Sequence, residues 1–115
     1  MRTIILMILM AALASCSEKS SPSKYLIAGG TYNENFWGDK LKIHGTITNT
    51  AKSATFKDAV IKVSYMTKTN SVIHTANYTL YEYFPPGNVQ PFELKIDNYV
   101  NTEKLKWEVI GAKSD

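Results

Sequence analysis

The side chains best suited to nucleophilic or metal chemistry are the only cysteine, Cys16, and the two histidines, His44 and His74. A thiolate is a strong nucleophile, and neutral imidazole is a common zinc ligand. Both histidines are expected on the polar faces of strands that lie well apart in the sequence. Because zinc sites take three or four ligands, a site here would also have to recruit Asp39 or Glu82. We therefore predict two ordinary surface histidines and no metal site.

The sequence lacks the motifs that position other catalytic groups. No serine lies in a G-x-S-x-G turn, and Gly29-Gly30 is an isolated pair and no phosphate-binding loop. Glu82 and Glu93 are the carboxylates nearest to aromatic residues, and nothing around them indicates a glycosidase pair. We predict a protein that is not an enzyme and uses no cofactor. Cys16 then remains as the residue whose chemistry needs an explanation.

The segment before Cys16 is typical of an export signal. Residues 1–3 carry one cation, Arg2, and residues 4–14 form an uninterrupted apolar run. A helix that spans a bilayer needs about 20 apolar residues, so this run is too short to remain as an anchor. The order of cation, apolar run and small residues predicts a signal peptide over residues 1–15 that is removed after export.

The residues Leu13-Ala14-Ser15-Cys16 resemble the lipobox of bacterial lipoproteins, in which Leu and two small residues precede the cysteine. The resemblance implies that a diacylglyceryl group is attached to the Cys16 sulfur and that the chain is cleaved before Cys16. It predicts a protein held at a bacterial cell membrane by membrane lipid through the acylated cysteine. By analogy with sorting in Gram-negative bacteria, Ser17 in place of Asp favours the outer membrane.

The mature chain, residues 16–115, has the size of one small domain. Without Arg2, the 13 cationic residues fall to 12 lysines against 10 acids, and these lysines are scattered singly. Since proteins that bind nucleic acids show basic clusters, no nucleic acid partner is predicted. Residues 16–23 are small and polar and include Pro22, which predicts a lipidated, disordered tether before a folded domain over residues 24–115.

From residue 24 onward the chain is patterned for β-strands. Apolar and polar residues alternate strictly over 39–49, which is typical of a half-buried strand. Related patterns between turn sequences predict strands at 24–30, 58–66, 72–84, 91–96 and 105–111. Short strands without a helical period predict an all-β fold, a small antiparallel sandwich like those of immunoglobulin and fibronectin-III domains. The expected core contains Ile43, Ile47, Ile61, Val63, Phe92, Leu94 and Trp107.

Residues 39–96 also carry a recurring set of small, apolar and turn residues. The set comprises Gly45, Ile47, Asn49, Ile61, Val63, Tyr65, Pro86, Gly87, Phe92 and Leu94. In this arrangement the segment resembles the FxLYD-type domain of exported bacterial proteins. The resemblance implies an immunoglobulin- or fibronectin-III-like sandwich, and the family has no known activity to carry over.

The segment 77–84 carries more aromatic residues than one packed face can hold. Alternation places Tyr78, Leu80 and Phe84 on one side of the strand, and Tyr81 and Tyr83 on the other. Tyrosine and tryptophan are enriched at binding surfaces because their large rings carry a polar group. We predict that Tyr81 and Tyr83 lie exposed near residues 85–88 and bind a partner together with Trp37. Alternatively, these rings cover the edge of a sheet.

Two functions are compatible with these features. In the first, the protein is a non-enzymatic binding module that contacts an envelope protein or another envelope component near the membrane. In the second, it is a structural envelope accessory without a specific ligand site. An exposed aromatic patch favours the first function, and a uniformly polar surface favours the second.

Overall fold

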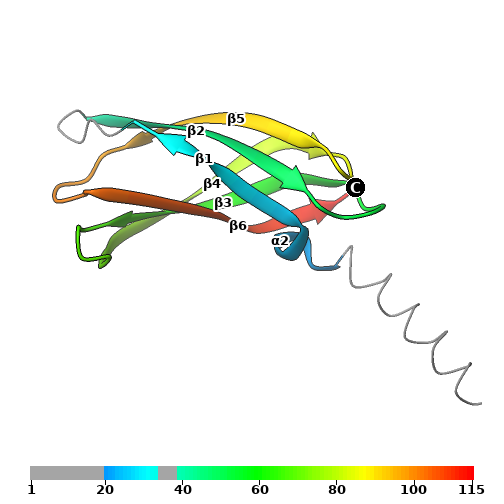
Figure 1. Ribbon diagram of the computed structural model, residues 1–115, viewed down its shortest axis with the longest axis horizontal. Helices are drawn as coiled ribbons and strands as arrows, with labels where there is room; N and C mark the ends of the chain where they lie inside the picture. Colours follow the sequence, from blue (N-terminus) through cyan, green and yellow to red (C-terminus); the bar gives the residue numbers. More distant parts are fainter. Residues whose placement is uncertain (1–19, 34–38) are drawn as a thin grey trace, which may run out of the picture.

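The protein is a two-layered β-sandwich, seen from the side in Figure 1. The computed structural model describes residues 20–33 and 39–115. The first antiparallel sheet has the strand order β1–β2–β5, with β1 Leu26–Tyr32, β2 Lys40–Asn49 and β5 Val89–Asp97. The second has the order β4–β3–β6, with β4 Val72–Phe84, β3 Phe56–Met66 and β6 Lys104–Ser114. The predicted small all-β sandwich is therefore confirmed.

A single helical turn, α2 (Pro22–Tyr25), precedes β1. Pro22 is well suited to this position because its fixed φ matches the start of a helix and its missing N–H needs no partner there. Thr50 donates from its backbone N–H to the Tyr25 carbonyl oxygen at 2.8 Å, which ties the turn to the end of β2. Pro22 and Ser23 are thus folded, a correction to the disordered tether predicted over 16–23.

The core lies between the two sheets and follows the alternation of the sequence. Of the predicted core residues, Ile43, Ile47, Ile61 and Val63 are completely buried. Phe92, Leu94 and Trp107 are only partly buried and pack against the margin of the core, which corrects their predicted central position. Ile96 of β5 and Val109 of β6 are buried, so the inward residues of one strand differ in how far they reach into the core.

Glycines in neighbouring strands make room for side chains and backbone at close range. Gly45 pairs with Phe92 across β2 and β5, and a Cβ at Gly45 would lie 2.4 Å from a carbon of the Phe92 ring. Gly30 pairs with Gly45 across β1 and β2 and has a φ of 120°, a conformation that favours glycine. This part of the first sheet therefore depends on the absence of side chains.

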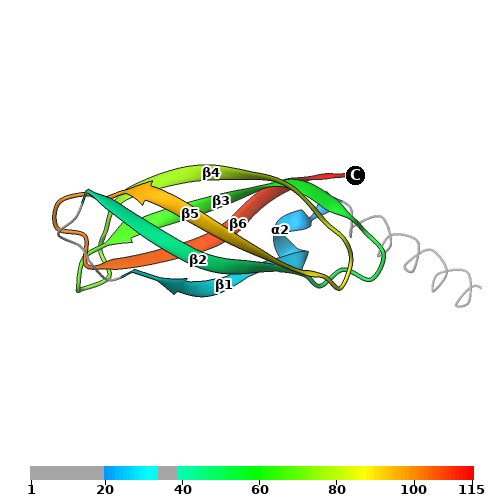
Figure 2. The ribbon, with the colours of Figure 1, turned by 90° about the horizontal axis from the view of Figure 1, so that it is seen from above.

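The two ends of the sandwich are built from different segments. One end, which we name the α2 end, contains α2, residues 50–55, the turn 85–88 and the C-terminal Asp115. Backbone hydrogen bonds join these segments: Gly87 donates to Asn49 at 2.8 Å, and Asp115 donates to Thr55 at 3.0 Å. Figure 1 shows α2, the C-terminus and the β4–β5 connection on the same side, and Figure 2 shows α2 beside β6. The opposite end holds residues 67–71 and 98–103.

Candidate functional site

Tyr81 and Tyr83 lie on the outward side of β4 beside the α2 end. Their relative exposures are 81% and 59%, whereas the adjoining Phe84 is 1% exposed and belongs to the core. Tyr83 pairs with Lys57 of β3, and the turn 85–88 follows one residue after it. We name the two rings the Tyr81–Tyr83 surface. Both tyrosines lie where the alternation of the sequence places them, next to the proline-containing turn.

An irregularity in β3 shapes the sheet beneath this surface. Two β4 residues, Tyr81 and Glu82, stand opposite the single residue Asp58, which has a φ of 53°. As a result, Lys57 and Asp58 both lie outside the core, between the buried Phe56 and Ala59. A β-bulge of this kind increases local twist and changes the direction of side chains. The Tyr81–Tyr83 surface therefore lies on a strongly twisted part of the sheet.

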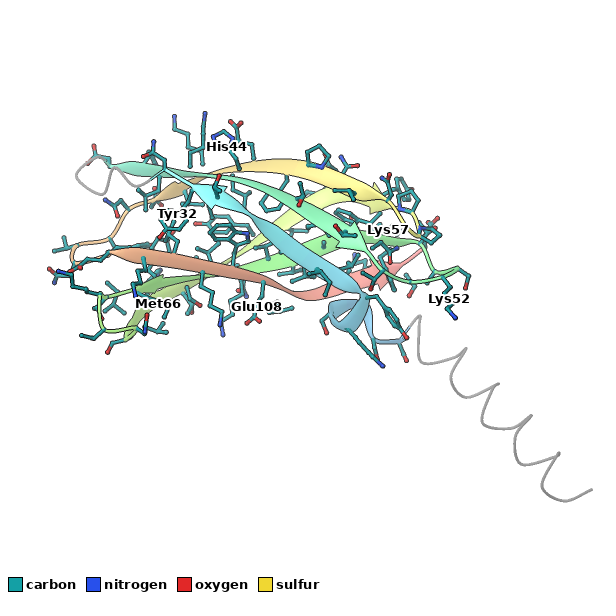
Figure 3. All side chains as sticks on the ribbon, in the orientation of Figure 1. Tyr32, His44, Lys52, Lys57, Met66 and Glu108 are labelled. Carbon is teal, nitrogen blue, oxygen red and sulfur yellow. The ribbon has the colours of Figure 1, made fainter. Side chains whose placement is uncertain are left out.

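The charges around the Tyr81–Tyr83 surface are largely balanced. Lys57 Nζ lies 3.8 Å from Asp115 Oδ1, and Lys113 Nζ lies 3.9 Å from Asp58 Oδ2. Lys113 also pairs with Lys57 across β3 and β6. Figure 3 shows Lys57 and Lys52 at the same end of the molecule as α2. These long, exposed contacts leave the tyrosine rings as the main distinguishing feature of this surface.

Asn49 fixes the position of the strand end that carries the two tyrosines. Its side chain is fully buried, and Nδ2 donates to the carbonyl oxygens of Ala54 at 2.9 Å and Phe84 at 2.8 Å. Its Oδ1 accepts from the Ala51 N–H at 2.9 Å. One amide thus joins the end of β2, the crossover to β3 and the end of β4. Asn49 is among the residues that resemble FxLYD-type domains, but these hydrogen bonds were not predicted from the sequence.

Two of the predicted site residues, Cys16 and Trp37, lie outside the described residues. The described residues that bracket Trp37 lie at the opposite end from Tyr81 and Tyr83. Asn33 donates to the Lys42 carbonyl oxygen at 2.9 Å, and Asn98 donates to that of Asp39 at 3.0 Å. Tyr81 and Tyr83 therefore lie together at the α2 end. Asn33 and Asp39, the described residues on either side of the Trp37 segment, lie at the opposite end.

His44 lies on the outer face of β2, as expected, and contacts a charged pair. His44 Nδ1 is 3.3 Å from Glu93 Oε2, and Lys42 Nζ is 3.0 Å from Glu93 Oε1. The hydrogen bond from Lys42 lowers the pKa of Glu93 below its usual value, so this carboxylate stays ionised at neutral pH. His44 and Glu93 border a shallow depression of about 520 Å³ beside Gly30 and Gly45. A carboxylate held in this form is a poor general acid.

His74 is exposed, as expected for a surface histidine, but it lies on the same side of β4 as Ala76 and Tyr78, which corrects the predicted polar face. It pairs with the buried Tyr65, and its ring lies 3.9 Å from that of Tyr99 between ring centroids. Regular alternation places it there, because His74 lies an even number of positions before Tyr78 and Leu80, and the β3–β4 register shift comes only after the Tyr65–His74 pair. His74 therefore joins an aromatic cluster of Tyr65 and Tyr99 at the opposite end. Within the described part of the chain, no three His, Cys, Asp or Glu residues are grouped as metal ligands.

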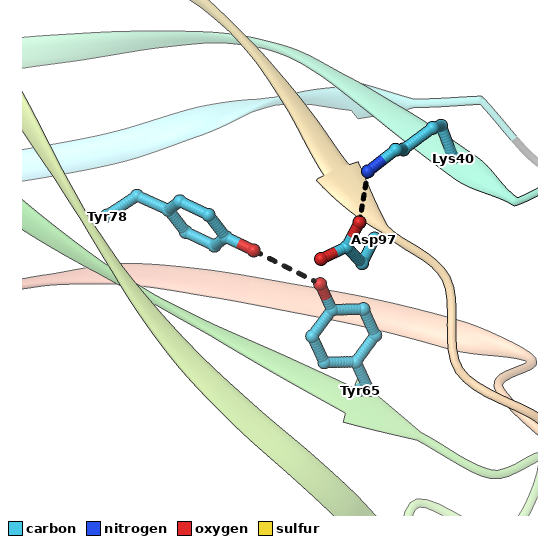
Figure 4. A network of polar contacts seen from close by, with 4 residues as sticks. All are labelled: Lys40, Tyr65, Tyr78 and Asp97. Carbon is cyan, nitrogen blue, oxygen red and sulfur yellow. Dashed lines mark hydrogen bonds and ion pairs between the residues drawn. The ribbon is translucent and has the colours of Figure 1, made fainter.

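Polar groups extend from this cluster to the edge of the first sheet (Figure 4). The hydroxyls of Tyr65 and Tyr78 lie 3.5 Å apart, and Lys40 forms an ion pair with Asp97. Burial, assisted by the Tyr78 hydrogen bond, raises the pKa of Tyr65. A phenol with a raised pKa remains protonated at neutral pH and serves as a structural hydrogen-bonding group.

A small cavity of about 350 Å³ lies along the seam between β1 and β6. Trp107 and Tyr32 line it, with their ring centroids 5.8 Å apart in an edge-to-face arrangement. The Trp107 indole donates to the Gly29 carbonyl oxygen at 3.2 Å. This bond occupies the only polar group of the indole ring. The cavity is open to solvent and is lined by Gly29, Gly30 and Lys106 as well as by the two rings, and it was not indicated by any sequence motif.

No helix in the described ranges is both long and apolar enough to cross a membrane. The chain matches no family model, no curated protein and no solved structure.

Proposed function

We propose that this chain is a lipid-anchored, non-enzymatic binding module of the bacterial cell envelope. Its anchor would be a diacylglyceryl group on Cys16, placed there by the lipobox-like Leu13–Cys16 sequence. Two acyl chains give stable membrane attachment, whereas one gives only marginal binding. In a Gram-negative cell, Ser17 favours the outer membrane as the destination.

The observation that carries the binding role is the exposure of two tyrosines, one on each side of Glu82, on a single strand face. Tyr81 and Tyr83 leave much of their ring area in water, at 81% and 59% exposure. Aromatic rings with a hydroxyl group offer large, rigid contact area and a hydrogen bond at the wet side. Two such rings side by side favour a binding surface over a purely structural role.

The likeness to FxLYD-type domains is part of the same proposal. Three of the shared positions have clear structural roles in this chain. Gly45 admits the Phe92 ring, Asn49 joins three segments, and Gly87 adopts a φ of 75° in the turn after β4. Such roles explain why these residue types would be retained in a family defined by its fold and lacking catalytic residues.

A photo-crosslinking amino acid at position 83 of the full chain, expressed in bacteria, tests the binding role. Lys106 is a matched control because it is an exposed residue on β6 of the same sheet. We expect crosslinks to an envelope component from position 83 and none from position 106. A lipidated, membrane-bound protein that crosslinks from neither position would instead support the structural accessory.

A further inference from the structure

The tether and the Tyr81–Tyr83 surface meet at the same end of the sandwich. Tyr25 of α2 accepts the Thr50 backbone hydrogen bond, and the neighbouring Asn49 donates to the Phe84 carbonyl oxygen. Tyr83 directly precedes Phe84 in β4. Hydrogen bonds of Asn49 and Thr50 therefore connect α2 to the end of β4 that carries the exposed rings, although α2 and β4 are far apart in the sequence.

The length of chain before α2 limits how far this end can lie from a membrane. Only residues 17–19 separate Cys16 from Ser20, the first residue that the structure describes. Even fully extended, the four steps from Cys16 to Ser20 span at most about 14 Å. A bilayer of 40–45 Å with a hydrocarbon core of about 30 Å has headgroup layers of roughly 5–8 Å each. An acylated Cys16 would therefore hold the α2 end close to the lipid headgroups.

The α2 end carries apolar side chains that suit this location. Besides Tyr81 and Tyr83, Ile27 and Val89 are about half exposed, and both pair with Thr48 near the end of β2. Tyrosine is enriched at membrane–water interfaces because its ring is apolar and its hydroxyl is polar. Two of the nearby lysines, Lys57 and Lys113, lie 3.8 Å and 3.9 Å from Asp115 and Asp58, so part of the positive charge at this end is balanced.

We propose that the Tyr81–Tyr83 surface contacts the headgroup layer of the bilayer in which Cys16 is anchored. The sandwich is then held with its α2 end on the membrane and with the aromatic cluster of Tyr65, His74 and Tyr99 facing away from it. This inference rests on the proposed lipid anchor and names the lipid surface as the partner of the Tyr81–Tyr83 surface.

Site-specific fluorescence of the full, processed protein in phosphatidylcholine vesicles tests this orientation. In Glu82→Cys, an environment-sensitive probe is attached to the exposed residue that separates the two tyrosines in the sequence, and acylated Cys16 has no free thiol to compete. Val100→Cys places the same probe at the opposite end, on a side chain that is 86% exposed. We expect lipids with a nitroxide at the headgroup to quench the probe at 82 strongly and the probe at 100 hardly at all.

Adding Tyr81→Ser and Tyr83→Ser to Glu82→Cys should reduce the quenching strongly while the protein still floats with the vesicles and keeps its β-sheet circular dichroism spectrum. Unquenched probes at both positions on floating vesicles would show that the domain moves freely on its tether and would overturn the proposal. Equal quenching at both positions would overturn the orientation. If a crosslinker at position 83 captured only protein in native membranes, the lipid surface would be ruled out as the partner of the Tyr81–Tyr83 surface. Failure to float would reject the lipid anchor itself.

Discussion

Asn49 shows how one buried amide can organise one end of a small domain. Its side chain makes three hydrogen bonds to the backbones of Ala51, Ala54 and Phe84. A buried backbone group that loses its partner costs about 1–3 kcal/mol. The position of Tyr83 next to Phe84 therefore depends on a residue in the other sheet.

Replacing Asn49 with Asp should destabilise the fold severely. The shape is kept, but a carboxylate oxygen would replace Nδ2 and face the carbonyl oxygens of Ala54 and Phe84. We expect a loss of about 3 kcal/mol or more in the free energy of unfolding, measured with urea. Asn77→Asp is the matched control, since Asn77 is exposed on β4 and should change stability by less than about 0.5 kcal/mol. Equal effects of the two substitutions would contradict the role of Asn49.

At the scale of single elements, alternation determines which side of a strand faces the core but not how deeply each residue on that side is buried. Trp107 of β6 packs against the core margin, contacts Tyr32 edge to face and bonds to Gly29. It therefore links the edge strands β1 and β6 of the two sheets. It does not fill the centre.

Trp107→Ala should cost about 2 kcal/mol of unfolding free energy, less than the 3–5 kcal/mol typical of a fully buried tryptophan. Trp107→Phe keeps ring contact but loses the indole hydrogen bond, so it should cost about 1 kcal/mol. Circular dichroism during urea unfolding measures both values. A cost above about 4 kcal/mol for Trp107→Ala would indicate that the ring is central to the core after all.

The aromatic cluster at the opposite end predicts a dependence of stability on alkaline pH. Burial raises the pKa of Tyr65 in the folded protein, so its contribution is complete below the ordinary tyrosine value of about 10. That contribution is lost as the pH rises toward the folded value, because the unfolded chain then releases the proton more easily. We expect the unfolding free energy to fall more steeply above about pH 10 in the wild type than in Tyr65→Phe. Parallel pH profiles for the two proteins would contradict this coupling.

Much of the fold could be predicted because alternation determines which side of a strand is buried. Ile43 and Ile47 alternate with polar residues and are both buried, as predicted. His74 was assigned to the wrong face, although alternation from Tyr78 and Leu80 puts it on their side of β4, and its ring contact with Tyr99 leaves no mark in the pattern of a single strand. The partial exposure of Phe92 likewise leaves no mark in that pattern.

At the scale of the whole molecule, the candidate site depends on contacts between distant segments. Alternation alone put Tyr81 and Tyr83 on one side of β4. Their nearness to α2, and so to the chain that leads back to Cys16, arises only through Asn49 and Thr50 at the end of β2. For this reason the sequence predicted an anchor and an aromatic pair separately and gave no relation between them.

Membrane anchoring through Cys16 is tested most directly by the intact mass of the protein purified from bacterial membranes, together with mapping of its N-terminal peptide. We expect a chain that begins at Cys16 and carries a diacylglyceryl group on its sulfur, and we expect Cys16→Ala to remain uncleaved and without acyl mass. A wild-type chain that keeps residues 1–15, begins at another residue or has a free Cys16 thiol would contradict the proposed anchor.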